Sequence, residues 1–287
     1  MPQVSNILFP VSFSPSCVAM AAYVRRAADL YHAKVSLIHV FDPASYNGFE
    51  LYVRPPSEIE QEHQNIARNR LNSFLADEFP ISDCSRILVE GDTATNIAAV
   101  ARTGFDLIIM PTHAGRFRRM LLGSTTAKVL NDADCPVLTS KHALTIAPRP
   151  LNHRVWLCAV GLGEDSERVL RYAHQAEAEL HGKLHIIHAI QPTDPKLPIQ
   201  LELEERVQSE ERQQVRRRFD ELQQRVGTRA PVQIAVGPIK HALLEAARQF
   251  DADALVIGRS PSPSADGRIR DLTYAMVRDS PFPVLSI

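Results

Sequence analysis

The stretch "DLIIMPTHAGRFRRMLLGSTTAKVLNDADCPVLT", Asp106 to Thr139, contains the succession of patterns that decides the fold. A short apolar run near Asp106–Pro111 predicts a buried strand, and the sequence from Gly123 predicts a helix start with Ser124 as its N-cap. A second apolar run, Pro136–Thr139, predicts another strand. Strand, helix and strand in this order are typical of a parallel sheet with helical crossovers.

The same alternation extends toward the amino terminus. Short apolar, β-branched runs near Asn6–Val11, Lys34–Phe41 and Arg86–Val89 predict strands that are covered on both faces. Ser14-Pro15 predicts the N-cap and first turn of a helix that reaches about Tyr31. Gly91-Asp92 opens another helix. We therefore expect a doubly wound, five-stranded parallel sheet with helices on both sides.

A second copy of this pattern follows the first. "VSLIHVFDP" (Val35–Pro43) matches "LHIIHAIQP" (Leu184–Pro192) at a spacing of 149 positions, and "DLIIMPTH" (Asp106–His113) matches "DALVIGRS" (Asp253–Ser260) at 147. The predicted fold class is thus α/β, with two Rossmann-like doubly wound domains in tandem. We place the domains at residues 1–143 and 153–287, with a proline-containing linker at 144–152.

The composition of the chain excludes some classes of function. The chain of 287 residues has 32 basic and 33 acidic side chains, so no field of one sign attracts nucleic acid or an anionic membrane. We find no leader sequence and no apolar run near the ~18 residues of a membrane span, and therefore expect a cytoplasmic protein. The cysteines lack C-x-x-C spacing, which predicts buried, reduced thiols: Cys17, Cys84, Cys135 and Cys158.

Ligands of an open parallel sheet bind beyond the carboxyl ends of its strands, where the strand order reverses. The loop before the helix at Gly123 is therefore the main candidate site. Unpaired N–H groups of Ser124, Thr125 and Thr126 would point at an anion there, and Arg116 with its neighbouring arginines would add positive charge. The alternative is an ordinary capped helix whose arginines are solvated.

The stretch from Asp106, together with "FPVSFSPSC" near the amino terminus, resembles the signature of the universal stress protein family. In that family, Gly-x-x-Gly, nine residues and then Gly-Ser or Gly-Thr wrap a nucleoside triphosphate. This chain departs from the pattern: Pro111 stands at the first glycine, only seven residues separate Gly115 from Gly123, and Ser12 stands at the usual aspartate after the first strand.

The resemblance implies an ATP site in the first domain, with Mg²⁺ accompanying the triphosphate. It places Ser12 and Phe13 beside the nucleoside, Val40 at the base and Gly91 near the ribose. It also assigns the phosphate contacts, from Thr112, His113, Gly115 and Arg116 around the phosphates and from Gly123, Ser124 and Thr125 as donors.

The second copy departs further from the signature. Arg270 and Asp271 replace Gly123 and Ser124, and Gly161 replaces Ser12. An acid at the start of the helix repels phosphate, so we expect only the first domain to bind nucleotide. The second would then serve as its intramolecular partner.

Two other features have structural and functional interpretations. His39 and His188 occupy matching strand positions, which predicts either a packing role beside a polar contact or a metal or acid–base role. The polar stretch Leu201–Val226 predicts an amphipathic surface helix, or a coiled coil that binds a partner.

The resemblance implies a tandem universal stress protein that senses or stores adenine nucleotide and acts through an unidentified protein partner, with a homodimer as a further possibility. The competing class is a nucleotide-free interaction module in which both sites have lapsed. We see no positioned general base, and so expect slow ATP hydrolysis at most.

Overall fold

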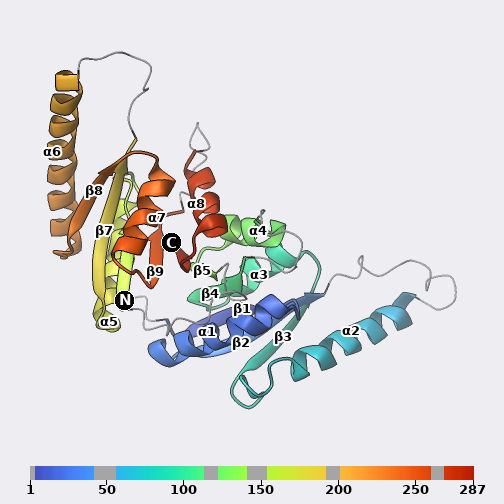
Figure 1. The fold of residues 1–287 in the computed structure, drawn as a ribbon. Helices are drawn as coiled ribbons and strands as arrows, with labels where there is room; N and C mark the ends of the chain where they lie inside the picture. Colours follow the sequence, from blue (N-terminus) through green and yellow to red (C-terminus); the bar gives the residue numbers. More distant parts are fainter. Residues whose placement is uncertain (1–3, 42–55, 113–121, 141–153, 192–200, 260–267) are drawn as a thin grey trace. The chain divides into compact units, whose positions relative to one another are not determined.

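The computed structural model describes residues 4–41, 56–112, 122–140, 154–191, 201–259 and 268–287. The chain forms two compact units, made mainly of residues 2–151 and 152–276 (Figure 1). Each unit is a parallel α/β sheet with helical crossovers. No described helix combines the length and the apolar character that crossing a membrane requires.

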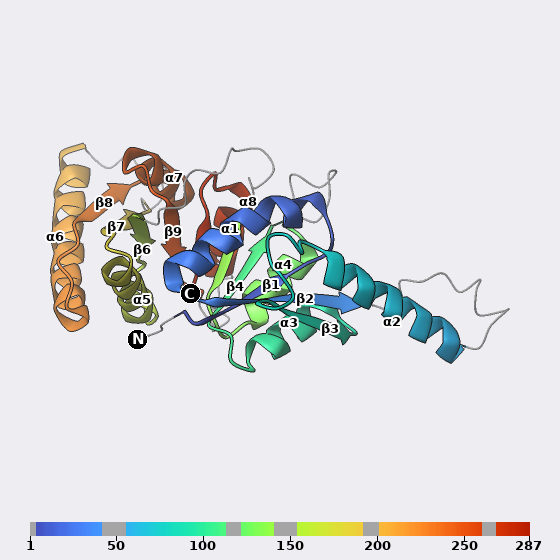
Figure 2. The same cartoon turned by 90° about the horizontal axis from the view of Figure 1, so that it is seen from below.

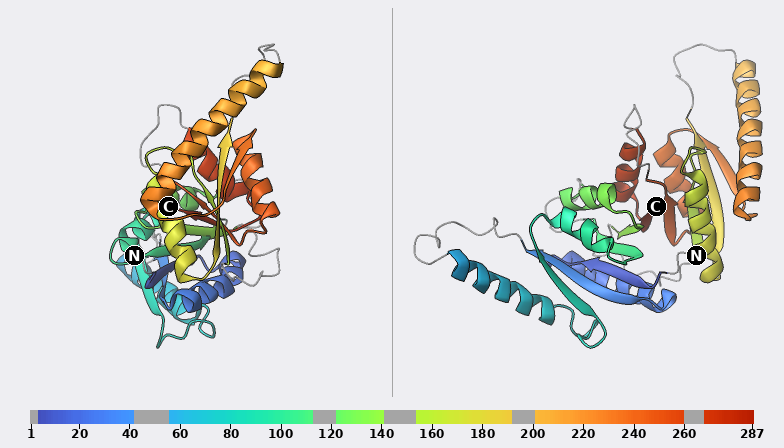
Figure 3. Two further views of the ribbon diagram at one scale, coloured as in Figure 1. Left: turned by 90° about the vertical axis from the view of Figure 1, so that its left-hand side faces the viewer. Right: turned by 180° about the vertical axis from the view of Figure 1, so that it is seen from behind.

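The first unit alternates strands and helices from Asn6 onward. Its elements are β1 (Asn6–Pro10), α1 (Pro15–Tyr31), β2 (Lys34–Phe41), α2 (Pro56–Ser73), β3 (Ser85–Glu90), α3 (Thr93–Ala101), β4 (Leu107–Pro111), α4 (Ser124–Asp132) and β5 (Val137–Ser140). The strand order is β3-β2-β1-β4-β5, and neighbouring strands pair in parallel. Figure 3 shows α1 and α2 on one face and α3 and α4 on the other.

The second unit repeats the same arrangement. Its elements are β6 (Val155–Ala159), α5 (Ser166–Glu179), β7 (Lys183–Ile190), α6 (Leu201–Val226), β8 (Val232–Val236), α7 (Ile239–Gln249), β9 (Ala254–Ile257), α8 (Arg268–Asp279) and β10 (Val284–Ser286). The strand order is β8-β7-β6-β9-β10, again with parallel pairing. The predicted fold class is therefore confirmed for both halves of the chain.

Helix α6 is amphipathic, as its sequence predicts. Val215, Phe219, Leu222 and Val226 lie on one stripe, and all four side chains are buried. This stripe packs within the second unit, where α6 contacts α5. The surface-helix interpretation is thus correct for the part of α6 whose side chains are described.

A buried aliphatic layer explains why the strands form where the sequence predicts them. Ile7, Leu8 and Phe9 of β1 are fully buried, as are Leu107, Ile108 and Ile109 of β4 to within 2 %. All four cysteines are free. Cys17, Cys84 and Cys158 are buried as expected, whereas Cys135 is only half-buried, so the prediction of burial is wrong for Cys135. The apolar character of both strand faces matches a sheet covered on both sides.

A carboxylate fastens the amino ends of the two central strands in each unit. Asp106, just before β4, accepts hydrogen bonds from the backbone N–H groups of Ser5 and Asn6 at 2.8 and 2.9 Å. Asp253 does the same before β9, accepting from the N–H groups of Arg154 and Val155 at 2.8 and 2.9 Å. The repeated aspartate therefore has a structural role in setting the register of neighbouring strands.

We predict that Asp106→Ala lowers the free energy of unfolding by about 2 kcal/mol, because two N–H groups lose a charged acceptor. Urea denaturation followed by circular dichroism measures this change. Asp77→Ala is the matched control, since Asp77 is an exposed carboxylate for which the structure shows no hydrogen bond. Equal stability of the two variants would contradict the proposed fastening role.

Candidate functional site

The strand order of the first unit reverses at the boundary between β1 and β4, and we use the word crevice for the strand carboxyl ends at this boundary. The chain passes from β1 to β2 and β3 on one side, and then returns to β4 and β5 on the other. The segments that leave β1 and β4 at their carboxyl ends therefore separate at this point, which is where open parallel sheets bind ligands. Ser12 follows β1 and Thr112 follows β4, so both lie at this edge.

Helix α4 begins at the crevice without a side-chain cap. Gly123 is its N-cap, with φ −62° and ψ 139°, and Ser124 is the first helical residue. The prediction that Ser124 is the N-cap is therefore wrong by one position. Glycine has no side chain to accept a hydrogen bond from the first turn, so the N–H groups of that turn receive no side-chain cap.

The backbone after β4 packs tightly against this helix start. The N–H group of Gly123 donates to the carbonyl oxygen of Thr112 at 3.3 Å, and the Thr126 hydroxyl lies 3.4 Å from the same oxygen. A Cβ added at Gly123 would lie 3.2 Å from that carbonyl oxygen. Glycine at this position thus allows the helix start to approach the end of β4.

Thr112 contributes a polar atom that lacks a partner. Its side chain is 1 % exposed, and its hydroxyl oxygen has no hydrogen-bond partner among the described residues. Buried hydroxyls in folded proteins nearly always have a partner. An unsatisfied hydroxyl beside uncapped N–H groups fits an anionic ligand that accepts hydrogen bonds from both.

Helices α1 and α3, which also start at this edge, are capped by their own side chains. The Ser14 hydroxyl accepts from the Cys17 N–H at 3.4 Å at the start of α1. Asp92 caps α3 by accepting from the Thr95 N–H at 2.9 Å and the Thr95 hydroxyl at 2.6 Å, bonds that lower the pKa of Asp92 to about 2. Of the starts of α1, α3 and α4, that of α4 is therefore the one where an external anion can replace a missing side-chain cap.

The nucleoside side of the predicted site is built around Phe13. This residue has φ 58°, a left-handed conformation that is uncommon for a bulky side chain. Its ring packs on His39 at a centroid distance of 4.2 Å and on Phe74 at 5.2 Å. The sharp corner turns the chain from β1 into α1 and leaves Ser12 exposed at the end of the strand.

His39 holds this corner from the neighbouring strand. Its Nδ1 lies 2.8 Å from the carbonyl oxygen of Val11, so Nδ1 donates to that oxygen. The matching His188 lies 2.7 Å from the carbonyl oxygen of Val160. These bonds favour the packing interpretation of the repeated histidine, and the described residues contain no group of three side chains that could hold a metal.

The remaining predicted residues are spread along the edge or lie outside the described residues. Val40 is a buried residue of β2, one position before the strand ends at Phe41. Gly91 follows β3 with φ 117°, which favours glycine, and its N–H group donates to Phe41 at 2.9 Å. Because β3 lies two strands from β1, Gly91 is about 10 Å from the crevice. His113, Gly115 and Arg116 fall outside the described residues.

Sequence reasoning missed two contributors to this edge, Arg70 and Phe74. Arg70 and Phe74 come from the carboxyl end of α2 and the residue that follows it, and Figure 2 shows α2 projecting past the carboxyl ends of the strands. The polar sequence of α2 contains no signal for these contacts. Arg218 of the second copy, 148 positions after Arg70, could have indicated Arg70, but the residue at the same spacing from Phe74 is Leu222.

The second unit has the same left-handed corner after its first strand as the first unit, but its last helix, α8, starts at a different position. Leu162 has φ 58°, equal to that of Phe13. Helix α8, however, starts at Arg268, whereas the residue that matches Ser124 is Asp271. Because α4 and α8 end at matching positions, α8 is three residues longer at its start. Arg270 therefore lies inside the helix, and the helix start is displaced by about 4.5 Å along the axis.

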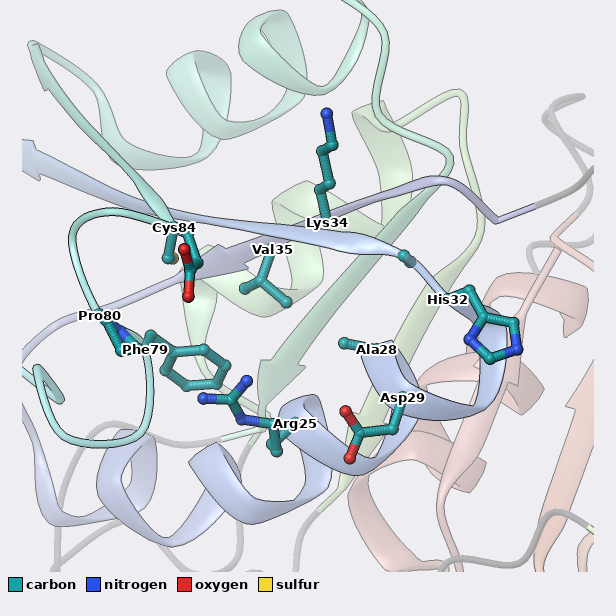
Figure 4. Close-up of a pocket in the computed structure, with 11 residues that line it drawn as sticks. Arg25, Ala28, Asp29, His32, Lys34, Val35, Phe79, Pro80 and Cys84 are labelled. Carbon is teal, nitrogen blue, oxygen red and sulfur yellow. The ribbon is translucent and has the colours of Figure 1, made fainter.

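A separate hollow of about 290 Å³ lies at the opposite edge of the first sheet (Figure 4). It is formed by the end of α1, the start of β2 and the loop before β3, with Phe79 and Cys84 in its wall. Its charged side chains carry both signs: Arg25, Asp29, His32, Lys34 and Asp83. No predicted site residue lines it, so it is distinct from the crevice at the strand carboxyl ends.

Two doubly wound units in one chain define a tandem α/β protein of the Rossmann-like class. The pattern that defines the universal stress protein family matches residues 3–141 and again residues 153–287. The chain therefore belongs to the universal stress protein family, as the resemblance in its sequence indicates.

Individual relatives agree with this assignment. Universal stress protein A homolog 2 of Coxiella burnetii is 33 % identical over 107 residues, which are 37 % of this chain and 73 % of that protein. A universal stress protein from Archaeoglobus fulgidus has the same fold with a TM-score of 0.65 and 21 % identity, over 99 % of this chain and 96 % of the other. A Pseudomonas aeruginosa protein of unknown function also has a TM-score of 0.65, with 18 % identity over 100 % of this chain and 93 % of the other.

We predict that His39 makes the stability of the first unit depend on pH. Burial lowers its pKa below the ordinary value of 6.5, and the nearby Arg70 acts in the same direction. The unfolded chain therefore binds more protons than the folded chain just below pH 6.5. The stabilisation is fully present above that pH and is lost as the pH falls through the folded pKa.

Urea unfolding between about pH 7 and about pH 5 measures this dependence. His39→Gln keeps a donor for Val11 but does not titrate, so its stability should fall less steeply over this range. His241→Gln is the control, because His241 is largely exposed. His185, whose pKa is also lowered by burial, accounts for the dependence that remains in His39→Gln. An unchanged slope in His39→Gln would contradict the prediction.

Proposed function

We propose that the first unit binds an adenine nucleotide, with its phosphates at the start of α4 and its nucleoside toward the ends of β1 and β2. The observation that carries this proposal is the first turn of α4, which has no side-chain cap, together with the buried hydroxyl of Thr112, which has no hydrogen-bond partner among the described residues. Both need an acceptor, and phosphate oxygens are acceptors that suit a helix N-terminus. The family membership supports adenine as the base.

The proposed contacts follow the residues named from the sequence. Gly123, Ser124 and Thr125 would supply backbone and hydroxyl donors to the phosphates, and Thr112 would supply its hydroxyl. His113, Gly115 and Arg116 would surround the phosphates, while Ser12, Phe13, Val40 and Gly91 would face the nucleoside and ribose. Mg²⁺ would be held chiefly by the phosphate oxygens of ATP, since hard cations prefer oxygen ligands.

We propose further that the second unit does not bind nucleotide. The earlier start of α8 removes the space that a phosphate would occupy above the matching helix start. Asp271 would add a negative charge at the position of Ser124. The second unit would then act as a partner for the first, with the linker at 144–152 joining domains 1–143 and 153–287.

The biological role we propose is regulation by nucleotide occupancy in the cytoplasm, read out by a protein partner. The four free thiols support a reducing compartment. Catalysis beyond slow ATP hydrolysis is not part of the proposal, because His39 is already bonded to Val11 and buried beneath Phe13. Such a histidine is poorly placed to act as a general base.

Isothermal titration of the full chain with ATP and Mg²⁺ tests the binding proposal. We expect one nucleotide per chain. Ser124→Asp should weaken ATP at least tenfold, because two like charges 4 Å apart repel by about 4 kcal/mol at an effective dielectric of 20. An acid in the first turn favours the helix itself, so the variant should remain folded.

Ser57→Asp is the matched control. It adds the same charge to the first turn of another helix, α2, at the end remote from Arg70. Its affinity for ATP should equal that of the unmodified chain. Absence of binding by the unmodified chain would favour the nucleotide-free interaction module instead. Two nucleotides per chain would contradict the proposal that the second unit is inactive.

A further inference from the structure

Arg70 brings a positive charge to the nucleoside side of the crevice. It lies in the last turn of α2, and its guanidinium carbon is 4.5 Å from the centroid of the Phe13 ring. Phe13 directly follows Ser12, the residue at the end of β1. The charge therefore lies beside the place where the nucleoside is proposed to bind, on the opposite side from α4.

The guanidinium keeps its hydrogen-bonding capacity. Stacking on an aromatic ring occupies the face of the planar group and leaves its N–H donors free to point outward in the plane. Among the described residues, no carboxylate lies within ion-pairing distance of Arg70. Its side chain is exposed, so a ligand can reach these donors from solvent. Arginine in this state is well suited to bind a phosphate through two parallel hydrogen bonds.

Serine at the end of β1 leaves this charge uncompensated. In dinucleotide-binding folds, an acid near the strand end bonds the ribose hydroxyls, whereas an arginine nearby accommodates a phosphate on the ribose. Here Ser12, the second residue after β1, donates its hydroxyl to Ser14 at 3.1 Å. Of the described acids at this edge, Glu90 ends β3, two strands from β1, and Asp92 accepts from Thr95 and lies 3.4 Å from Lys128.

We infer that the first unit prefers an adenine nucleotide carrying a second phosphate on its ribose, and that Arg70 binds that phosphate. This inference rests on the proposed nucleotide site and adds a specificity to it. The 5′-phosphate would lie at the start of α4, and the ribose phosphate would face the end of α2. The nucleotide would thus extend across Ser12 from the positively polarised start of α4 to the positive charge of Arg70.

The second unit shows what the same arginine does when it is committed to the protein. Arg218 of α6 donates from Nη2 to the carbonyl oxygen of Leu162 at 2.7 Å, with the neighbouring Phe219 packed on His188 at 5.6 Å. Leu162 matches Phe13. The corner is therefore braced in the second unit by a hydrogen bond from arginine, whereas in the first unit the ring of Phe13 leaves the donors of Arg70 available.

Isothermal titration of the full chain with each of three matched ligands tests the inference. The ligands are adenosine 5′-monophosphate, adenosine 3′,5′-bisphosphate and adenosine 2′,5′-bisphosphate. They differ only in the ribose phosphate. We expect one of the bisphosphates to bind the full chain about tenfold or more tightly than the monophosphate, as a charge-assisted pair would provide. The tighter bisphosphate identifies which ribose oxygen carries the phosphate.

Arg70→Met should abolish the preference and leave the affinity for the monophosphate unchanged, because methionine can still pack on Phe13. Arg68→Met, on the opposite side of the same helix, should keep the preference. Equal loss of affinity for all three ligands in Arg70→Met would mean that Arg70 only supports Phe13, and would overturn the inference.

Two outcomes separate the inference from the function on which it rests. ATP binding at α4 without any preference among the three ligands would overturn the inference and leave the nucleotide site intact. Failure of the unmodified chain to bind ATP and all three ligands would overturn both. Thermal unfolding followed by circular dichroism establishes that each variant is folded before it is titrated.

Discussion

The architecture of each half depends on one carboxylate that binds two backbone N–H groups. Asp106 holds Ser5 and Asn6 at the amino end of the central strands, and Asp253 holds Arg154 and Val155 in the second half. Because the amino ends of the central strands are held in register, the segments that follow these strands can separate only at the carboxyl ends. The crevice is therefore a consequence of how the strands are aligned at the far edge, some five residues away along β1 and β4.

The two halves share the same backbone arrangement and differ where a ligand would bind. The left-handed corner at Phe13 and Leu162 and the histidine that bonds the preceding valine are the same in both. The start of the last helix is not, because α4 begins with an uncapped glycine and α8 begins three residues earlier. Duplication has thus kept the contacts that the backbone geometry requires, while the contacts available to a ligand have diverged.

Regular elements followed directly from the sequence where local signals and burial agree. The apolar run Lys34–Phe41 is β2, and the proline after Ser14 begins α1 as predicted. No sequence pattern predicts helix α2, because its polar sequence has little apolar periodicity. The cap of α4 was misplaced because a glycine cap depends on backbone angles and leaves no side-chain signal. Arg70 meets Phe13 only after the chain has folded, so no local pattern could identify that contact.

The additional turn at the start of α8 has an evolutionary consequence. A single substitution that restored glycine at position 270 would place it inside a helix, where glycine weakens the helix without creating a new terminus. Reversion to a phosphate cradle would require the first turn to unwind and the preceding loop to change as well. A point mutation at position 270 therefore does not remove the difference between the two halves.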